Sequence, residues 1–239
     1  VRDYGGIGGL KTVSIRNLGA AHTAVSYDGV VVSNSQAGQI DIGRFSLDNV
    51  SSLSLAIGQD ENLLQPARLY ASAGVLSIET EKPVFENGKS SLSQIQIRGG
   101  AFGYIAPSIR RWQKLGEHTG LSVDASFIRA DGNYPFTLEN GKYITQEKRN
   151  NSDIHTWQGE ANLFHTFHDE STLDVKAYYF YSERGLPGAV ILYNPRQKNV
   201  CGTRISSPKP VIRKPSPPNG LCRRKPSSTI LGTNTKIQT

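Results

Sequence analysis

The sequence of 239 residues contains no methionine and starts at Val1, so we expect part of a longer protein or a processed product. It also lacks any stretch near the roughly 18 consecutive apolar residues that a membrane-spanning helix needs. No secretory signal is recognisable, and because we expect the start to be missing, this absence does not indicate a cytoplasmic protein. Any membrane role would therefore have to depend on strands.

Cysteine and acidic residues are unevenly distributed. Residues 195–239 hold both cysteines, seven of the 12 prolines and ten of the 27 Lys and Arg, and they have no acidic or aromatic residue. Residues 1–194 hold the other 17 basic residues against all 20 acidic ones, which makes this body net −3. The formal charge of +7 thus comes from the tail, and a nucleic-acid-binding body is not indicated.

Residues 195–239 form a basic, proline-rich tail that we interpret as translated out of frame or as disordered. Regrouping degenerate codons for Lys198–Thr203 one base earlier can encode Glu-Arg-Leu-Trp-Asp, which has the aromatic character of a strand in a membrane barrel. Under this hypothesis Cys201 and Cys222 are accidental, and neither a disulfide nor a zinc site is expected. A tail that binds RNA or anionic lipid is the alternative.

Residues 1–82 contain short β-prone runs separated by glycine and polar turns. Helical turns are expected at Ser46–Val50 and at Glu61–Gln65, which together with the strands predicts a small α+β domain. The glycine-rich segment Gly5–Gly9 has neither the lysine of a P-loop nor a dinucleotide fingerprint, so it is read as a flexible loop.

Residues 90–194 show a persistent period of two. Leu121, Val123, Ala125 and Phe127 alternate with polar residues, and the segments near Trp157 and Leu173 repeat the pattern. Strands of about ten residues with one apolar face, joined by alternately short and long connectors, are typical of a transmembrane barrel. We therefore predict about five antiparallel strands of an incomplete β-barrel; a soluble antiparallel sandwich is the alternative.

Several motifs in residues 1–82 occur in a particular order: Ile15–Gly19, Tyr27–Val30, Ala67–Val75 and Leu76–Thr80. In this order they resemble the plug domain of TonB-dependent outer-membrane receptors, most closely those of the Bacteroidetes type. The resemblance covers residues 1 to about 194, and Asn17 stands where the family usually has glycine. It implies a truncated receptor: an α+β plug domain at residues 1–82, followed by the first barrel strands at residues 90–194.

The resemblance also implies roles for particular residues. Arg16 would pair with carboxylates on the barrel wall, and Asp28 with Gly29 would form a hairpin turn of the plug. Candidates for loops that face incoming ligand are Asn34, Ser35, Gln36, Gln65, Arg68 and Tyr70.

A receptor of this kind imports a scarce nutrient, such as siderophore-bound iron, haem or cobalamin, across the bacterial outer membrane. The implied partners are a TonB-type energy-transducing complex, reached through a missing N-terminal segment, a small-molecule or metal-chelate ligand, and outer-membrane lipid. No nucleic acid and no cofactor are implied.

Enzymatic activity is not indicated by the sequence. No serine lies in a nucleophile-elbow pattern, and His165 and His168 are three apart on an expected strand, where side chains point to opposite faces. We therefore expect no catalytic residues and no metal site. A soluble β-rich surface or adhesion module with a basic disordered tail is the alternative function.

Overall fold

The computed structural model describes residues 1–33, 38–57, 69, 71–82, 85, 89–187 and 199–213. The chain divides into two compact units, Val1–Val84 and Phe85–Thr239. Strands make up 62% of the structure and helical residues 6%. Within the described residues, no helix has the length and apolar character to cross a membrane.

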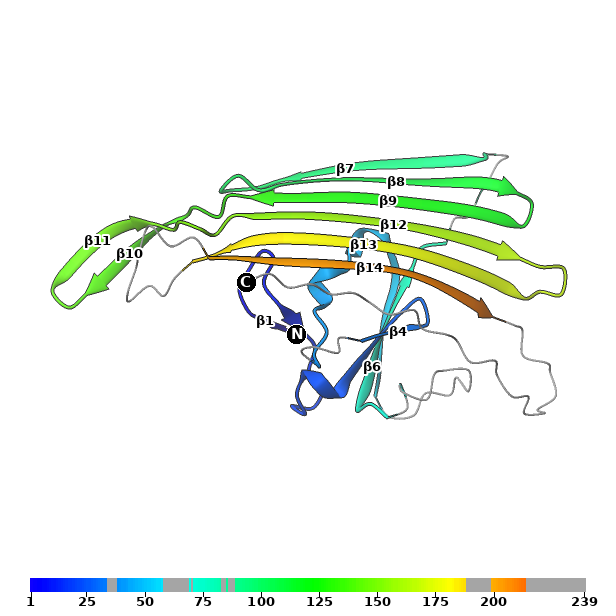
Figure 1. The fold of residues 1–239 in the computed structure, drawn as a ribbon, viewed down its shortest axis with the longest axis horizontal. Coiled ribbons are helices and arrows are strands. Elements are labelled where there is room, and N and C mark those ends of the chain that lie inside the picture. Colours follow the sequence, from blue (N-terminus) through cyan, green and yellow to red (C-terminus); the bar gives the residue numbers. More distant parts are fainter. Residues whose placement is uncertain are drawn as a thin grey trace. The chain divides into compact units, whose positions relative to one another are not determined.

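A four-stranded mixed sheet forms the N-terminal unit, with strand order β4-β3-β6-β5 (Figure 1). Strand β3 pairs parallel with β6, whereas β4 and β5 pair antiparallel with β3 and β6. The strand bounds are Thr23–Tyr27 for β3, Val30–Val32 for β4, Val50–Ile57 for β5 and Gly74–Thr80 for β6. A separate pair, β1 (Arg2–Asp3) with β2 (Lys11–Thr12), precedes them.

The core of this unit forms on both faces of the central strands. One cluster of buried residues consists of Val25, Tyr27, Ile40, Phe45, Leu76 and Ile78. Ala24, Leu69 and Val75 form a second cluster from the alternate positions. Strand β3 is buried at every position, including the polar Thr23 and Ser26, as expected for a strand that is covered on both sides.

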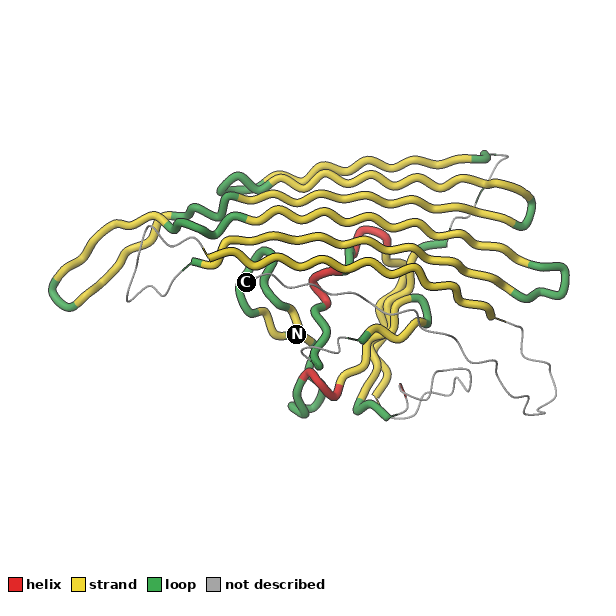
Figure 2. The backbone as a smooth tube through the Cα atoms, viewed as in Figure 1, coloured by secondary structure: helices red, strands yellow, loops and turns green. Residues whose placement is uncertain are grey.

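The predicted α+β fold is wrong, because the structure is nearly all β-sheet. The helical elements with described bounds are three 3-10 turns of three residues each: η1 (Ala20–His22), η2 (Ile42–Arg44) and η3 (Leu47–Asn49) (Figure 2). Asp41 and Ser46 do cap η2 and η3, accepting hydrogen bonds from Gly43 N and Asp48 N. Each turn returns to extended backbone after three residues, and so short a segment cannot repay the cost of nucleating an α-helix. The helical turn predicted at Glu61–Gln65 lies outside the described residues.

The C-terminal unit is built on a six-stranded antiparallel sheet in the order β14-β13-β12-β9-β8-β7. In Figure 1 these strands lie side by side as long ribbons. The strand bounds are Ser91–Gly99 for β7, Ile105–Gly116 for β8, Thr119–Ala130 for β9, Ile154–Thr166 for β12, Thr172–Leu186 for β13 and Asn199–Arg213 for β14.

None of the sheets closes into a barrel, which is the second correction to the predicted fold. Strands β7 and β14 end the order of the sheet and do not pair with each other. The smallest membrane barrels have eight strands, so a six-stranded meander is too narrow to close on itself.

The segment between β9 and β12, one of the long connectors, forms a hairpin of its own. Strands β10 (Pro135–Asn140) and β11 (Tyr143–Lys148) pair antiparallel around a turn in which Gly141 has φ 62°. At its base, the Tyr134 ring lies 6.1 Å from Phe102 and 6.4 Å from Phe136. These edge-to-face contacts give the hairpin a small apolar anchor.

Residues 199–213, which belong to the tail interpreted as out of frame or disordered, form β14 against β13. The physical reason is that strand pairing uses backbone groups and demands little of the side chains. Pro208 and Pro210 have no amide hydrogen, which restricts them to edge strands, and β14 is an edge. Residues 214–239 lie outside the described part of the chain.

Candidate functional site

Odd-numbered residues of β7, β8, β9, β12 and β13 share one face of the large sheet, as the strand register requires. We call this surface the apolar face. Its central positions are apolar and open to solvent: Ile95 is 71% exposed, Ile97 70% and Trp157 55%. Further exposed members are Ile105, Ile109, Val123 and Tyr179.

Aromatic rings concentrate at one level of the apolar face. The Phe127 and Trp157 rings lie 4.4 Å apart, and Tyr181 continues the row on β13. The guanidinium of Arg204 lies 5.8 Å from the Tyr179 ring centroid. Rows of aromatic side chains that border an apolar band, with charged groups beyond, are typical of strands at a lipid–water interface.

The apolar band runs obliquely across the strands. On β8 the apolar stretch covers Ile105–Ile109 and ends at Arg111, which the register places beside Val123. On β9 the apolar stretch extends beyond the level of Arg111, to Leu121. On β13 it extends further still, to Leu173, which the register places beside His165 of β12. The band therefore shifts along the strands from β8 to β13. A band of constant height crosses strands in this way when the strands are tilted, as membrane strands are by about 35–45°.

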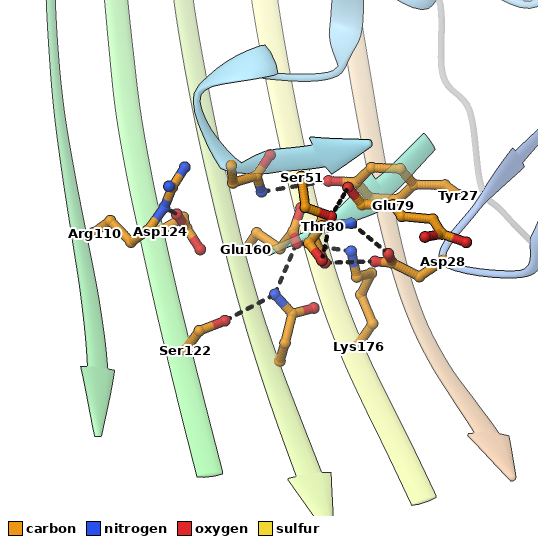
Figure 3. A network of polar contacts seen from close by, with 12 residues as sticks. Tyr27, Asp28, Ser51, Glu79, Thr80, Arg110, Ser122, Asp124, Glu160 and Lys176 are labelled. Atoms are coloured by element: carbon orange, nitrogen blue, oxygen red, sulfur yellow. Dashed lines mark hydrogen bonds and ion pairs between the residues drawn. The ribbon is translucent and has the colours of Figure 1, made fainter. Parts of the chain in front are cut away.

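The opposite, even-numbered face carries a polar network across four neighbouring strands (Figure 3). Glu160 on β12 accepts a hydrogen bond from Lys176 Nζ at 2.7 Å and another from Asn162 Nδ2 at 2.8 Å. Asn162 also donates to Ser122 Oγ at 3.1 Å. Glu160 is 4% exposed, so this carboxylate depends on its protein partners for solvation.

A second ion pair lies beside the first. Arg110 on β8 donates through Nε to Asp124 on β9, and its guanidinium is 5.1 Å from the Trp112 ring centroid. Asp124 and Glu160 are directly paired across β9 and β12. Two carboxylates in this position repel each other, and Arg110 and Lys176 offset the repulsion from the two outer sides. The formal charges of the four groups cancel, with the two carboxylates in the middle and one cation on each outer side.

In the N-terminal unit, Asp28 and Gly29 make the two-residue turn between β3 and β4. Their φ angles are 49° and 77°, the left-handed conformation that such a hairpin turn requires. The Asp28 carboxylate accepts hydrogen bonds from the Thr80 backbone N at 2.7 Å and from Thr80 Oγ1 at 2.9 Å (Figure 3). Asp28 therefore also fastens the end of β6 to the turn.

Arg16 lies in an exposed turn with φ 50°, next to Asn17 at φ 61°. Its predicted ion pair with a carboxylate of the other unit remains a prediction. The predicted ligand-facing residues lie outside the described residues: Asn34, Ser35, Gln36, Gln65, Arg68 and Tyr70.

The described residues contain no group of three or more His, Cys, Asp or Glu placed to hold a metal ion. His165 is the penultimate residue of β12, with Nδ1 2.8 Å from Thr119 Oγ1, and His168 lies in the following turn. The polar network was not predicted from the sequence. Charged residues at alternate positions of neighbouring strands could have suggested it, but only the register shows which of them meet.

Together the fold and the polar network define a two-faced, open antiparallel sheet whose exposed face is apolar and whose opposite face carries buried charges. No protein-family model matches the chain, and a search of curated proteins finds no match.

Proposed function

We propose that this chain is part of a TonB-dependent outer-membrane receptor, in which the apolar face of the large sheet contacts outer-membrane lipid. The observation that carries the proposal is the inverted polarity of that sheet: Ile95, Ile97 and Trp157 are exposed, while Glu160 is buried. A water-soluble sheet usually packs its apolar face inward and turns its charges to solvent. The motifs of residues 1–82 support the same assignment.

Burial energetics favour lipid contact over exposure to water. Full burial of one large apolar side chain stabilises by about 1.5–3 kcal/mol, and at least six such side chains of the apolar face are now about half exposed. Covering them would contribute on the order of 5–10 kcal/mol. An apolar surface of this extent needs a cover, and the oblique band with its aromatic border fits a bilayer.

The receptor would import a scarce nutrient, such as siderophore-bound iron, haem or cobalamin. It would bind the ligand at outward-facing loops and release it inward when a TonB-type complex displaces the N-terminal unit. The chain by itself should not transport, because the open edges of β7 and β14 would leave backbone groups unpaired in lipid. We propose no catalytic activity and no nucleic-acid partner.

The two tryptophans allow a direct test, because they lie on opposite faces of the same sheet. Trp157 is on the apolar face, whereas Trp112 is on the even face and is 5% exposed. The variants Trp112→Phe and Trp157→Phe each leave one fluorescent reporter. Both variants are refolded in micelles of an alkyl maltoside whose alkyl chain carries bromine, which quenches tryptophan fluorescence on contact. Micelles are suitable because they can cover one face of the sheet even though the sheet is open.

We expect bromine to quench Trp157 strongly and Trp112 little, relative to the same detergent without bromine. Equal quenching of the two reporters would show that the apolar face is not selectively in contact with alkyl chains. A chain that is monomeric and folded without detergent, with Trp157 open to an aqueous quencher, would support the soluble surface or adhesion module instead.

A further inference from the structure

Two histidines meet at the end of the large sheet where β8 joins β9 and β12 joins β13. His118 lies in the two-residue turn after β8, and His168 lies in the turn after β12. Their ring centroids are 5.6 Å apart, with an interplanar angle of 52°. Both residues are exposed, and no other part of the proposed function uses them.

The backbone holds the two turns in place beside each other. Thr166 N donates to His118 O at 2.9 Å, which joins the turns directly. Within the second turn, Phe167 N donates to Ser171 O at 2.8 Å and Glu170 N to Phe167 O at 3.1 Å. Because the turn backbones are already ordered, little conformational entropy would be lost when a ligand bridges the two rings.

The spacing of the rings fits a shared metal ion. An imidazole nitrogen binds Zn²⁺ at about 2.0–2.1 Å, which places the metal about 3.2 Å from the ring centroid. A metal ion about 3.2 Å from each of two ring centroids that are 5.6 Å apart makes a centroid–metal–centroid angle of about 120°. That angle lies close to the tetrahedral and trigonal values that imidazole-bound metals adopt.

We propose that His118 and His168 form a two-histidine site for a borderline divalent transition-metal ion, with Cu²⁺ bound more tightly than Ni²⁺ or Zn²⁺. The preference follows the general order of stability for nitrogen ligands. Since no third protein ligand lies in reach among the described residues, water completes the coordination. Glu117 and Glu170, which lie in the same two turns, add negative charge that favours a cation. The site needs only the two turns and is independent of the proposed receptor function.

The test is titration of the full chain with CuCl₂, and separately with NiCl₂, followed by calorimetry and by electron paramagnetic resonance of Cu²⁺. The variants are His118→Gln, His168→Gln and the double variant, with circular dichroism to show that each keeps its strands. His155→Gln is the matched control, because His155 lies on β12 near the opposite end of the sheet.

One equivalent of Cu²⁺ should bind with the spectral signature of two imidazole nitrogens. Loss of an outer-shell partner already lowers metal affinity by about 10- to 100-fold, so each single variant should lose at least about tenfold. The control should bind like the original chain. The proposal is overturned if the double variant binds as tightly as the original, if His155→Gln causes the same loss, or if no Cu²⁺ binds.

Discussion

Asp28 should stabilise the end of β6 through two separable contributions, its carboxylate and its backbone conformation. The carboxylate accepts two hydrogen bonds from Thr80, at 2.7 and 2.9 Å. Hydrogen bonds to a charged group contribute about 1.5–3 kcal/mol, and because Asp28 is only partly buried we assign that range to the pair together. An alanine at this position would also have to adopt the left-handed φ of 49°, which costs about 1 kcal/mol in addition to the lost hydrogen bonds.

Three substitutions separate these contributions. Asp28→Ala removes both the carboxylate and the tolerance of positive φ, so it should lower the free energy of local opening at β6 by about 2.5–4 kcal/mol. This corresponds to amide exchange that is roughly 60- to 700-fold faster. Asp28→Gly relieves the backbone and should lose only the hydrogen bonds, about 1.5–3 kcal/mol. Asp28→Asn keeps one acceptor and tolerates positive φ, so it should lose least, about 1 kcal/mol or less.

Hydrogen–deuterium exchange of the peptide that contains β6 is the appropriate assay, because both tryptophans belong to the other unit and would not report this opening. Amide exchange at β6 should be fastest in Asp28→Ala, slower in Asp28→Gly and slowest in Asp28→Asn. If Asp28→Gly exchanges no faster than Asp28→Asn, the carboxylate contributes no stability and the reasoning fails.

Three other predictions concern the sheets. Lys176→Met should destabilise the chain by about 3 kcal/mol in urea unfolding in detergent, because it removes the cation that hydrogen-bonds the buried Glu160 carboxylate. Adding Glu160→Gln to this variant should recover more than half of the lost stability. No recovery would show that the two residues are not a coupled pair. Val123→Arg should lower the free energy of unfolding in lipid-like micelles by about 2–4 kcal/mol, whereas the control Val123→Leu should change it very little. If the chain tolerates both substitutions equally, the apolar face does not contact lipid. Gly74→Ala should cost about 1–3 kcal/mol in thermal unfolding because its Cβ would collide with Ile15 Cδ1. Ile15→Val removes that atom and should restore part of the loss; no rescue would place the strain elsewhere.

Periodicity predicted part of the large sheet from the sequence. The alternation from Leu121 to Phe127 indicated a strand with one apolar face, and β9 covers it. A period of two assigns residues to faces but does not determine which residues of neighbouring strands are paired. The partnership of Arg110 with Asp124 depends on that register, so the sequence could not show the polar network.

Local signals explain why the smaller unit was predicted with the wrong fold class. Ser46, where a helical turn was predicted, is a good helix-capping residue, and the structure places it at the start of η3. Capping predicts where a helix can begin but not how far it continues. Continuation needs an apolar stripe at helical spacing, and the chain turns back to extended backbone at Phe45 and Val50 instead.

The apolar face stops where the composition of the chain changes. On β13 the row positions Tyr179 and Tyr181 are aromatic, whereas their partners on β14 are Ser206 and Arg204. Backbone pairing tolerates almost any sequence, so the pairing of β14 is compatible with a tail translated out of frame. That hypothesis predicts that the nucleotide sequence, read in the other frame after about codon 195, encodes apolar residues at these two positions. If the frame is intact, the lipid-contacting surface ends at β13, and β14 is a polar edge that the receptor proposal would have to place outside the bilayer.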